Sequence, residues 1–176
     1  MNTYLALFRG INVGGNHLLP MKELVVVLEG LGLQSVRTYI QSGNAVFHST
    51  AAAPTQLAAQ ISAAIHASHG FDPQVFLLDA DGLSAIIASN PFPEAEGNAL
   101  HFNFCDELPP APDLAGMERL KAADERYALK GKVLYLHAPQ GIGRSKLTAK
   151  LERLLGVPIT TRNWNTVRKL QEMVKN

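Results

Sequence analysis

The chain of 176 residues contains a single cysteine, Cys105, so it can form no internal disulfide. Small secreted domains usually depend on several disulfides, and this sequence does not fit that class. It has no apolar run long enough to cross a bilayer. Its first residues also lack the basic stretch and cleavage site of a secretory signal. We therefore expect a cytoplasmic protein that has no membrane partner.

The sequence also lacks a strong charge of either sign, since its formal net charge is +1. Proteins that coat nucleic acid without sequence preference are strongly basic, so we exclude that class but not a local basic pocket. Hydrophobic residues make up 47% of the chain, which is ample for a packed core.

The order of expected elements in the first half is β-α-β-β-α-β, which is typical of the ferredoxin-like fold. In chain order we expect a strand at 3–8, a helix opened by Pro20, strands at 36–40 and 45–48, a helix opened by Pro54, and a strand at 74–78. A short extra helix over 82–89 follows, capped by Asp79 or Asp81.

The second half repeats this order of elements. We expect a strand at 100–105, a helix at 113–120, strands at 124–129 and 133–137, a helix at 145–155, a strand at 157–161 and a last helix at 164–175. The chain is thus predicted to be an α+β protein with two tandem ferredoxin-like (βαββαβ) subdomains, each followed by an extra helix. The subdomains would span 1–90 and 98–176, with a linker at 91–97. A single large mixed sheet is the alternative.

Four segments are distinctive when they are taken together. They read RGINVGG from Arg9, TYIQSGN from Thr38, GIGRSKLT from Gly141 and TRNWNT from Thr161. In this order they resemble the bacterial family called domain of unknown function 1697, over essentially the whole chain. The resemblance implies two ferredoxin-like subdomains, and it implies no established activity, cofactor or catalytic residue.

The strongest candidate site is the segment before the helix at 145–155. A helix N-terminus exposes unpaired N–H groups and carries partial positive charge, and glycines let a phosphate approach the backbone. Arg144 and Lys146 would add positive charge there, and Ser145 or Thr148 could donate a hydroxyl. The alternative is a capped helix with two solvated basic residues.

Two further candidates lie in the first half. Arg9 and Asn12, in the glycine-rich turn after the first strand, could face a ligand, although such glycines more often only shape the connection. Tyr39, Ser42 and Asn44 lie at or beside a hairpin tip and could reach a ligand, whereas the alternative is that they serve the turn.

The segment that opens the last helix is the fourth candidate. Asn163 is expected to cap that helix. The cap does not explain why Arg162, Trp164 and Asn165 stand beside it. A tryptophan beside an arginine suits stacking on a planar ligand or a base. The alternative is that Trp164 anchors the helix on the sheet.

Alternation along the strands predicts which side chains face the helices. On this reasoning Leu5, Leu7, Phe102, Phe104, Leu134 and Leu136 face the helices. The open faces would then carry Tyr4, Ala6, Phe8, His101, Asn103, Cys105, Tyr135 and His137.

These observations favour a module that binds a phosphorylated small molecule or a nucleic acid at the glycine-rich loops. One alternative is an enzyme acting on a phosphate ester or nucleotide, with His101, His137 or Tyr39 as acid–base groups. Another is a structural or interaction protein, such as a homodimer that buries Tyr4, Phe8 or Tyr135 of an open sheet face. We expect no metal site and no cofactor.

Overall fold

The computed structural model describes residues 1–51 and 53–176, which form two compact units. The first unit comprises Met1–Ala85 with Leu170–Asn176, and the second comprises Ile86–Lys169. Each unit contains one four-stranded antiparallel sheet, with the strand order β2-β3-β1-β4 in the first and β6-β7-β5-β8 in the second. Both orders place the first and third strands of the unit at the centre, as in the ferredoxin-like fold. The predicted fold class is confirmed.

The elements of the first unit follow the predicted order closely. They are β1 (Asn2–Arg9), α1 (Met21–Gly30), β2 (Gln34–Thr38), β3 (Asn44–Ser49), α2 (Pro54–His69) and β4 (Gln74–Asp79), followed by α3 (Ala80–Ala88). Pro20 precedes α1 as its N-cap, because its ψ of 141° is extended, so the helix begins one residue later than predicted. Pro54 is the first residue of α2, and Gly70 ends that helix with a φ of +79°.

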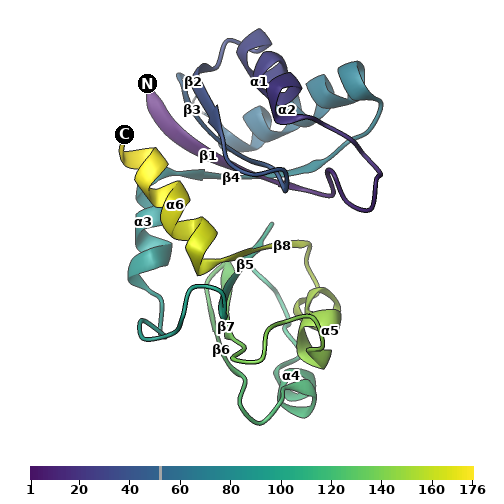
Figure 1. Cartoon of the computed structure of the whole chain (residues 1–176), viewed down its shortest axis with the longest axis vertical. Coiled ribbons are helices and arrows are strands. Elements are labelled where there is room, and N and C mark those ends of the chain that lie inside the picture. Colours follow the sequence, from purple (N-terminus) through teal and green to yellow (C-terminus); the bar gives the residue numbers. More distant parts are fainter. Residues whose placement is uncertain (52) are drawn as a thin grey trace. The chain divides into compact units, whose positions relative to one another are not determined.

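Helices α1 and α2 cover one face of the first sheet (Figure 1). Tyr4, Ala6 and Phe8 of β1 face these helices and pack in the same core as Leu24 and Ile61. The prediction that Tyr4, Ala6 and Phe8 lie on an open face is therefore wrong. Both alternating sets of β1 side chains are apolar and buried, so periodicity alone cannot tell which set faces the helices.

The elements of the second unit also match the predicted order. They are β5 (Leu100–Cys105), α4 (Leu114–Leu120), β6 (Arg126–Lys130), β7 (Val133–His137), α5 (Lys146–Leu155) and β8 (Ile159–Asn163), followed by α6 (Trp164–Lys175). Asp113 caps α4, because its Oδ1 accepts the N–H of Gly116 at 2.9 Å. Gly131, with a φ of +58°, forms the tight turn between β6 and β7.

Helices α4 and α5 cover one face of the second sheet, and the strand register decides which residues they meet (Figure 1). Phe102 lies opposite Tyr135, and Asn103 lies opposite Leu134. Directly opposed residues in antiparallel strands point to the same side, so Phe102 cannot share a face with Leu134. Leu134 packs against α5 as predicted, whereas the prediction that Phe102 and Phe104 face the helices is wrong.

The helices of the described residues are all too short or too polar to span a bilayer.

Candidate functional site

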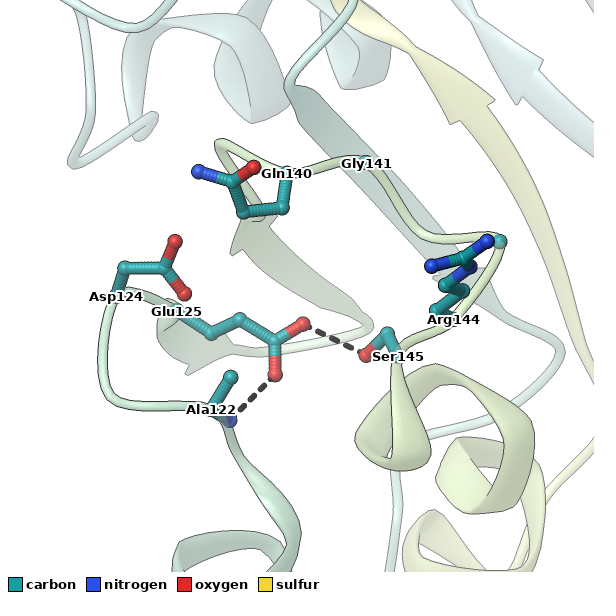
Figure 2. Close-up of a pocket in the computed structure, with 8 residues that line it drawn as sticks. Ala122, Asp124, Glu125, Gln140, Gly141, Arg144 and Ser145 are labelled. Atoms are coloured by element: carbon teal, nitrogen blue, oxygen red, sulfur yellow. Dashed lines mark hydrogen bonds between the residues drawn. The ribbon is translucent and has the colours of Figure 1, made fainter.

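A pocket of about 380 Å³ lies in the second unit, at the start of α5 (Figure 2). It is formed by the connection from α4 to β6 and by the connection from β7 to α5. Its lining consists of Ala122, Asp124, Glu125, Gln140, Gly141, Gly143, Arg144 and Ser145. The pocket thus contains the segment predicted as an anion site, together with acidic residues that were not predicted.

The position of the α5 N-terminus follows from its amphipathic sequence. Leu147, Leu151 and Leu155 are fully buried against the second sheet, which fixes the helix. Ser145 is the N-cap, and its Oγ accepts the N–H of Thr148 at 3.1 Å. Gly141, with a φ of +81°, allows the chain to turn before the helix.

Glu125 places a buried carboxylate in this pocket, since only 4% of the residue is exposed. Its Oε1 accepts the N–H of Ala122 at 2.7 Å, and its Oε2 accepts the hydroxyl of Ser145 at 2.6 Å. A negative charge beside a helix N-terminus is stabilised by the partial positive charge of the helix. The start of α5 therefore already has an anionic neighbour inside the protein.

The remaining charged groups give the pocket two different sides. Figure 2 shows Arg144 on one side of the pocket and Asp124 on the other. Both side chains are exposed, and within residues 1–51 and 53–176 Arg144 makes no hydrogen bond or ion pair. Lys146, the first residue of α5, is exposed as well. The pocket can therefore receive an anion at Arg144 and hydrogen-bond donors at Asp124 and Glu125.

The candidates of the first unit gather where the loop after β1 meets the β2–β3 hairpin. The Nδ2 of Asn12 donates to the carbonyls of Leu19 at 2.9 Å and Gln41 at 2.8 Å. The Oδ1 of Asn12 accepts the N–H of Leu19 at 2.7 Å. Asn44 is fully buried, and its Nδ2 donates to the carbonyl of Tyr39 at 2.9 Å. Asn12 thus joins the loop after β1 to the hairpin, and Asn44 closes the hairpin itself.

Gly43 explains why these loops meet so closely. Its φ is +95°, and a Cβ at this position would lie 2.5 Å from Cδ1 of Ile11. Ser42 is exposed at the hairpin tip, while Tyr39 and Arg9 are half-buried. The structure therefore brings all five candidates of the first unit to one region, where the asparagines brace the backbone.

The candidate residues at the start of α6 already have partners within the second unit. Arg162 is buried, and its Nη1 donates to Thr160 Oγ1 at 2.8 Å, while burial lowers its pKa to about 10. The Oδ1 of Asn163 accepts the N–H of Thr166 at 2.9 Å, as predicted for a cap. The ring of Trp164 stacks on Phe102, with centroids 5.7 Å apart. None of the three lines the pocket.

The two histidines of the enzyme hypothesis lie on opposite faces of the second sheet. His101 is opposite Leu136 in the register and therefore shares its face, whereas His137 is the next residue along β7 and points the other way. Burial lowers the pKa of His101, and the backbone of Ala99 partly offsets this effect. Neither histidine lines the pocket, so they cannot act there as an acid–base pair.

Sequence reasoning missed Asp124, Glu125 and Gln140. The sequence predicts a strand that starts at residue 124, whereas the strand begins at Arg126. No local signal marks a glutamate that is buried by a loop 20 residues away. Among the described residues, no three His, Cys, Asp or Glu side chains gather as a metal ion would require.

Comparison with known proteins supports the fold and leaves the activity open. A solved structure, that of the conserved bacterial protein SP0830 from Streptococcus pneumoniae, is similar to this chain with a TM-score of 0.76 and 28% sequence identity. The match covers 100% of this chain and 99% of that one. No functionally curated protein matches the sequence. The sequence profile described as "Protein of unknown function (DUF1697)" matches residues 1–135, and the chain therefore belongs to this family.

Proposed function

We propose that the protein binds a small phosphorylated molecule, one that also carries hydroxyl or amino groups, in the pocket before α5. The observation that carries this proposal is the exposed guanidinium of Arg144, which has no partner among the described residues, beside a pocket that also contains a buried carboxylate. An exposed cation on one side of the pocket and carboxylate acceptors further in suit a ligand that has both an anionic end and a donor end.

The phosphate would lie on the Arg144 side. Guanidinium groups bind phosphate through paired N–H donors. The first N–H groups of α5 have no acceptor within the helix, and Lys146 adds a second cation nearby. Gly141 and Gly143 are also part of the pocket lining, and they have no side chain that would keep a phosphate from the backbone.

The acidic side restricts what the rest of the ligand can be. Glu125 and Asp124 would repel a second phosphate, whereas they would accept hydrogen bonds from hydroxyl or amino groups. A pocket of about 380 Å³ is within the usual range for small-molecule sites. These features favour sugar phosphates and nucleoside monophosphates over polyphosphates.

The arrangement of aromatic residues favours a small molecule over RNA. RNA-binding modules of this fold class stack bases on aromatic side chains of the open sheet face. Here Phe102 and Tyr135 are buried, and Trp164 is stacked on Phe102. These rings pack against one another instead of presenting a stacking surface.

A binding screen tests the proposal. Thermal shift and calorimetry would use ribose 5-phosphate, AMP, inorganic pyrophosphate and a short RNA as probes, with wild type, Arg144→Ala and Arg153→Ala. Arg153 is an exposed arginine in the last turn of α5 and serves as the matched control. We expect a monophosphate to stabilise wild type and Arg153→Ala, and Arg144→Ala to bind about tenfold more weakly, or about 1.4 kcal/mol. No stabilisation by any monophosphate, or equal binding by all three proteins, would refute it.

A further inference from the structure

The exposed face of α5 carries only positive charge. Lys146, Lys150 and Arg153 lie four and three residues apart, so they share one face of this helix. Ala149 is the other exposed residue of α5, and its side chain is small. Arg144, which is also exposed, continues the row before the helix begins. We call Arg144, Lys146, Lys150 and Arg153 the basic stripe.

The basic stripe is arranged against the stability of the helix that carries it. Lys146 is the first residue of α5, where the partial positive charge of the helix N-terminus disfavours a cation. Lys146 and Lys150 also occupy a spacing at which like charges repel each other. In the part of the chain that the structure describes, none of the four side chains forms a hydrogen bond or an ion pair. Folding alone therefore gives no reason for this row of charges.

The acidic groups around the basic stripe have other partners. Helix α4 lies beside α5 (Figure 1), and three carboxylates of this layer accept hydrogen bonds from within the second unit, those of Asp113, Glu118 and Glu152. Asp124 is exposed, but it lies at the N-terminal end of the stripe, on the other side of the pocket from Arg144 (Figure 2). A ligand of the stripe therefore has no ion pair to displace.

We infer that the basic stripe binds the phosphate backbone of a nucleic-acid duplex. Lysine and arginine bind backbone phosphates through charge and hydrogen bonds, and such contacts need no apolar surface. An acidic protein would need apolar or aromatic anchors at the centre of its interface, and the exposed face of α5 offers only Ala149. Since the whole chain has a net charge of only +1, the contact is local to this face.

Two features favour a duplex over a single strand. Proteins that hold single strands stack the bases on aromatic rings. Helix α5 contains no aromatic residue, and the rings of Phe102, Tyr135 and Trp164 pack on one another. From Lys146 to Arg153 the stripe spans about 10 Å, or about three nucleotides along one strand of a duplex. The stripe can thus follow one strand without reading its bases.

The binding of a fluorescein-labelled DNA duplex, followed by fluorescence anisotropy, tests the inference. Wild type should bind at about 50 mM salt and lose affinity roughly 100-fold by about 200 mM, as expected for four phosphate contacts. In the double variant Lys150→Gln, Arg153→Gln, the slope of log affinity against log salt should fall by about half. The control variant Lys22→Gln, Lys132→Gln removes the same charge from exposed lysines outside α5 and should behave like wild type.

The double variant at Lys150 and Arg153 also separates this inference from the proposed function. Neither residue lines the pocket, so the variant should bind a monophosphate as wild type does. Both side chains are exposed, so its thermal stability should stay close to that of wild type. A clear loss of stability would make these cations part of the fold and would overturn the inference.

Three further outcomes would overturn it. In the first, wild type does not bind the duplex at low salt. In the second, both double variants lose affinity equally, which would reflect net charge alone. In the third, a single strand of the same length, or poly-glutamate as a model of an acidic protein, binds more tightly than the duplex.

Discussion

The hydroxyl of Ser145 donates to the carboxylate of Glu125 across 2.6 Å, while the same oxygen accepts the N–H of Thr148. A serine hydroxyl has one hydrogen, so this hydrogen is committed to Glu125. Ser145 therefore serves as the cap of α5 and cannot donate to a ligand without breaking its bond to Glu125. In the proposed complex, donors to the phosphate come from Arg144 and from the backbone.

The Glu125→Gln variant should be less stable than wild type by about 1–2 kcal/mol. The substitution removes a buried negative charge from the N-terminus of α5 and weakens the bonds from Ser145 and Ala122. Urea unfolding monitored by circular dichroism would measure the change. The matched control is Asp124→Asn, because Asp124 is exposed and lines the same pocket. Equal stability of the two variants would mean that Glu125 does not hold the loop.

The Asn12→Ala variant should lose about 2–4 kcal/mol of unfolding free energy. Alanine removes the three hydrogen bonds of the side chain, and the φ of +53° at this position is costly for a residue other than asparagine or glycine. Asn16→Ala changes an exposed asparagine of the same loop and should stay within about 0.5 kcal/mol of wild type. A small effect at Asn12 would contradict its role in bracing the two loops.

Cys105 should be unreactive in the folded protein. Burial raises the pKa of its thiol to about 11, so almost none of it is thiolate at pH 8. Ellman's reagent should release one equivalent of chromophore only after the protein is unfolded in guanidinium. Rapid reaction under native conditions would show that the second unit opens far more readily than its packing suggests.

The protein should lose stability as the pH falls below about 6.5, with a contribution from His101. Burial lowers the pKa of His101 in the folded state from 6.5. Below that pH His101 binds a proton in the unfolded chain but not in the folded chain, so the free energy of unfolding decreases. Urea unfolding at pH 5.5 and 7.5 should show a smaller difference for His101→Gln than for wild type. His48→Gln, at a half-buried histidine of β3 that forms no ion pair among the described residues, should leave the difference unchanged.

Trp164 should contribute to folding through its contact with Phe102. Trp164→Ala should cost about 2–3 kcal/mol, and Trp164→Phe, which retains a ring for stacking, should cost less than half of that. Thermal unfolding of wild type, Trp164→Ala and Trp164→Phe would measure these differences in stability. If alanine had no effect on stability, the side chain would have to serve another purpose, such as contact with a ligand.

Much of the fold was predictable because the signals are local. The bounds of β5 and α6 match the prediction, and Asp79, Asn163 and Gly70 cap or end helices as their side chains or backbones favour. Local signals could not predict which side chains of each strand face the helices. Phe102 and Leu134 are both buried and apolar, and only the pairing between β5 and β7 separates their faces.

The residues of the candidate site also divide into those that the sequence could predict and those that it could not. Arg144, Ser145 and Lys146 could be found because a glycine-rich segment before an amphipathic helix is a recognisable pattern. Glu125 could not, because its burial and its bond to Ser145 come from tertiary packing between two loops. Its presence narrows the proposed ligand from any phosphorylated small molecule or nucleic acid to a molecule with two chemically different ends.

The first unit takes seven of its residues from the far end of the chain. Leu170–Asn176 belong to it, and the Nη2 of Arg37 donates to the carbonyl of Met173 at 2.6 Å. During translation these residues leave the ribosome only after all of the second unit has been synthesised. The contact between β2 and Met173 can therefore form only after the second unit has been synthesised.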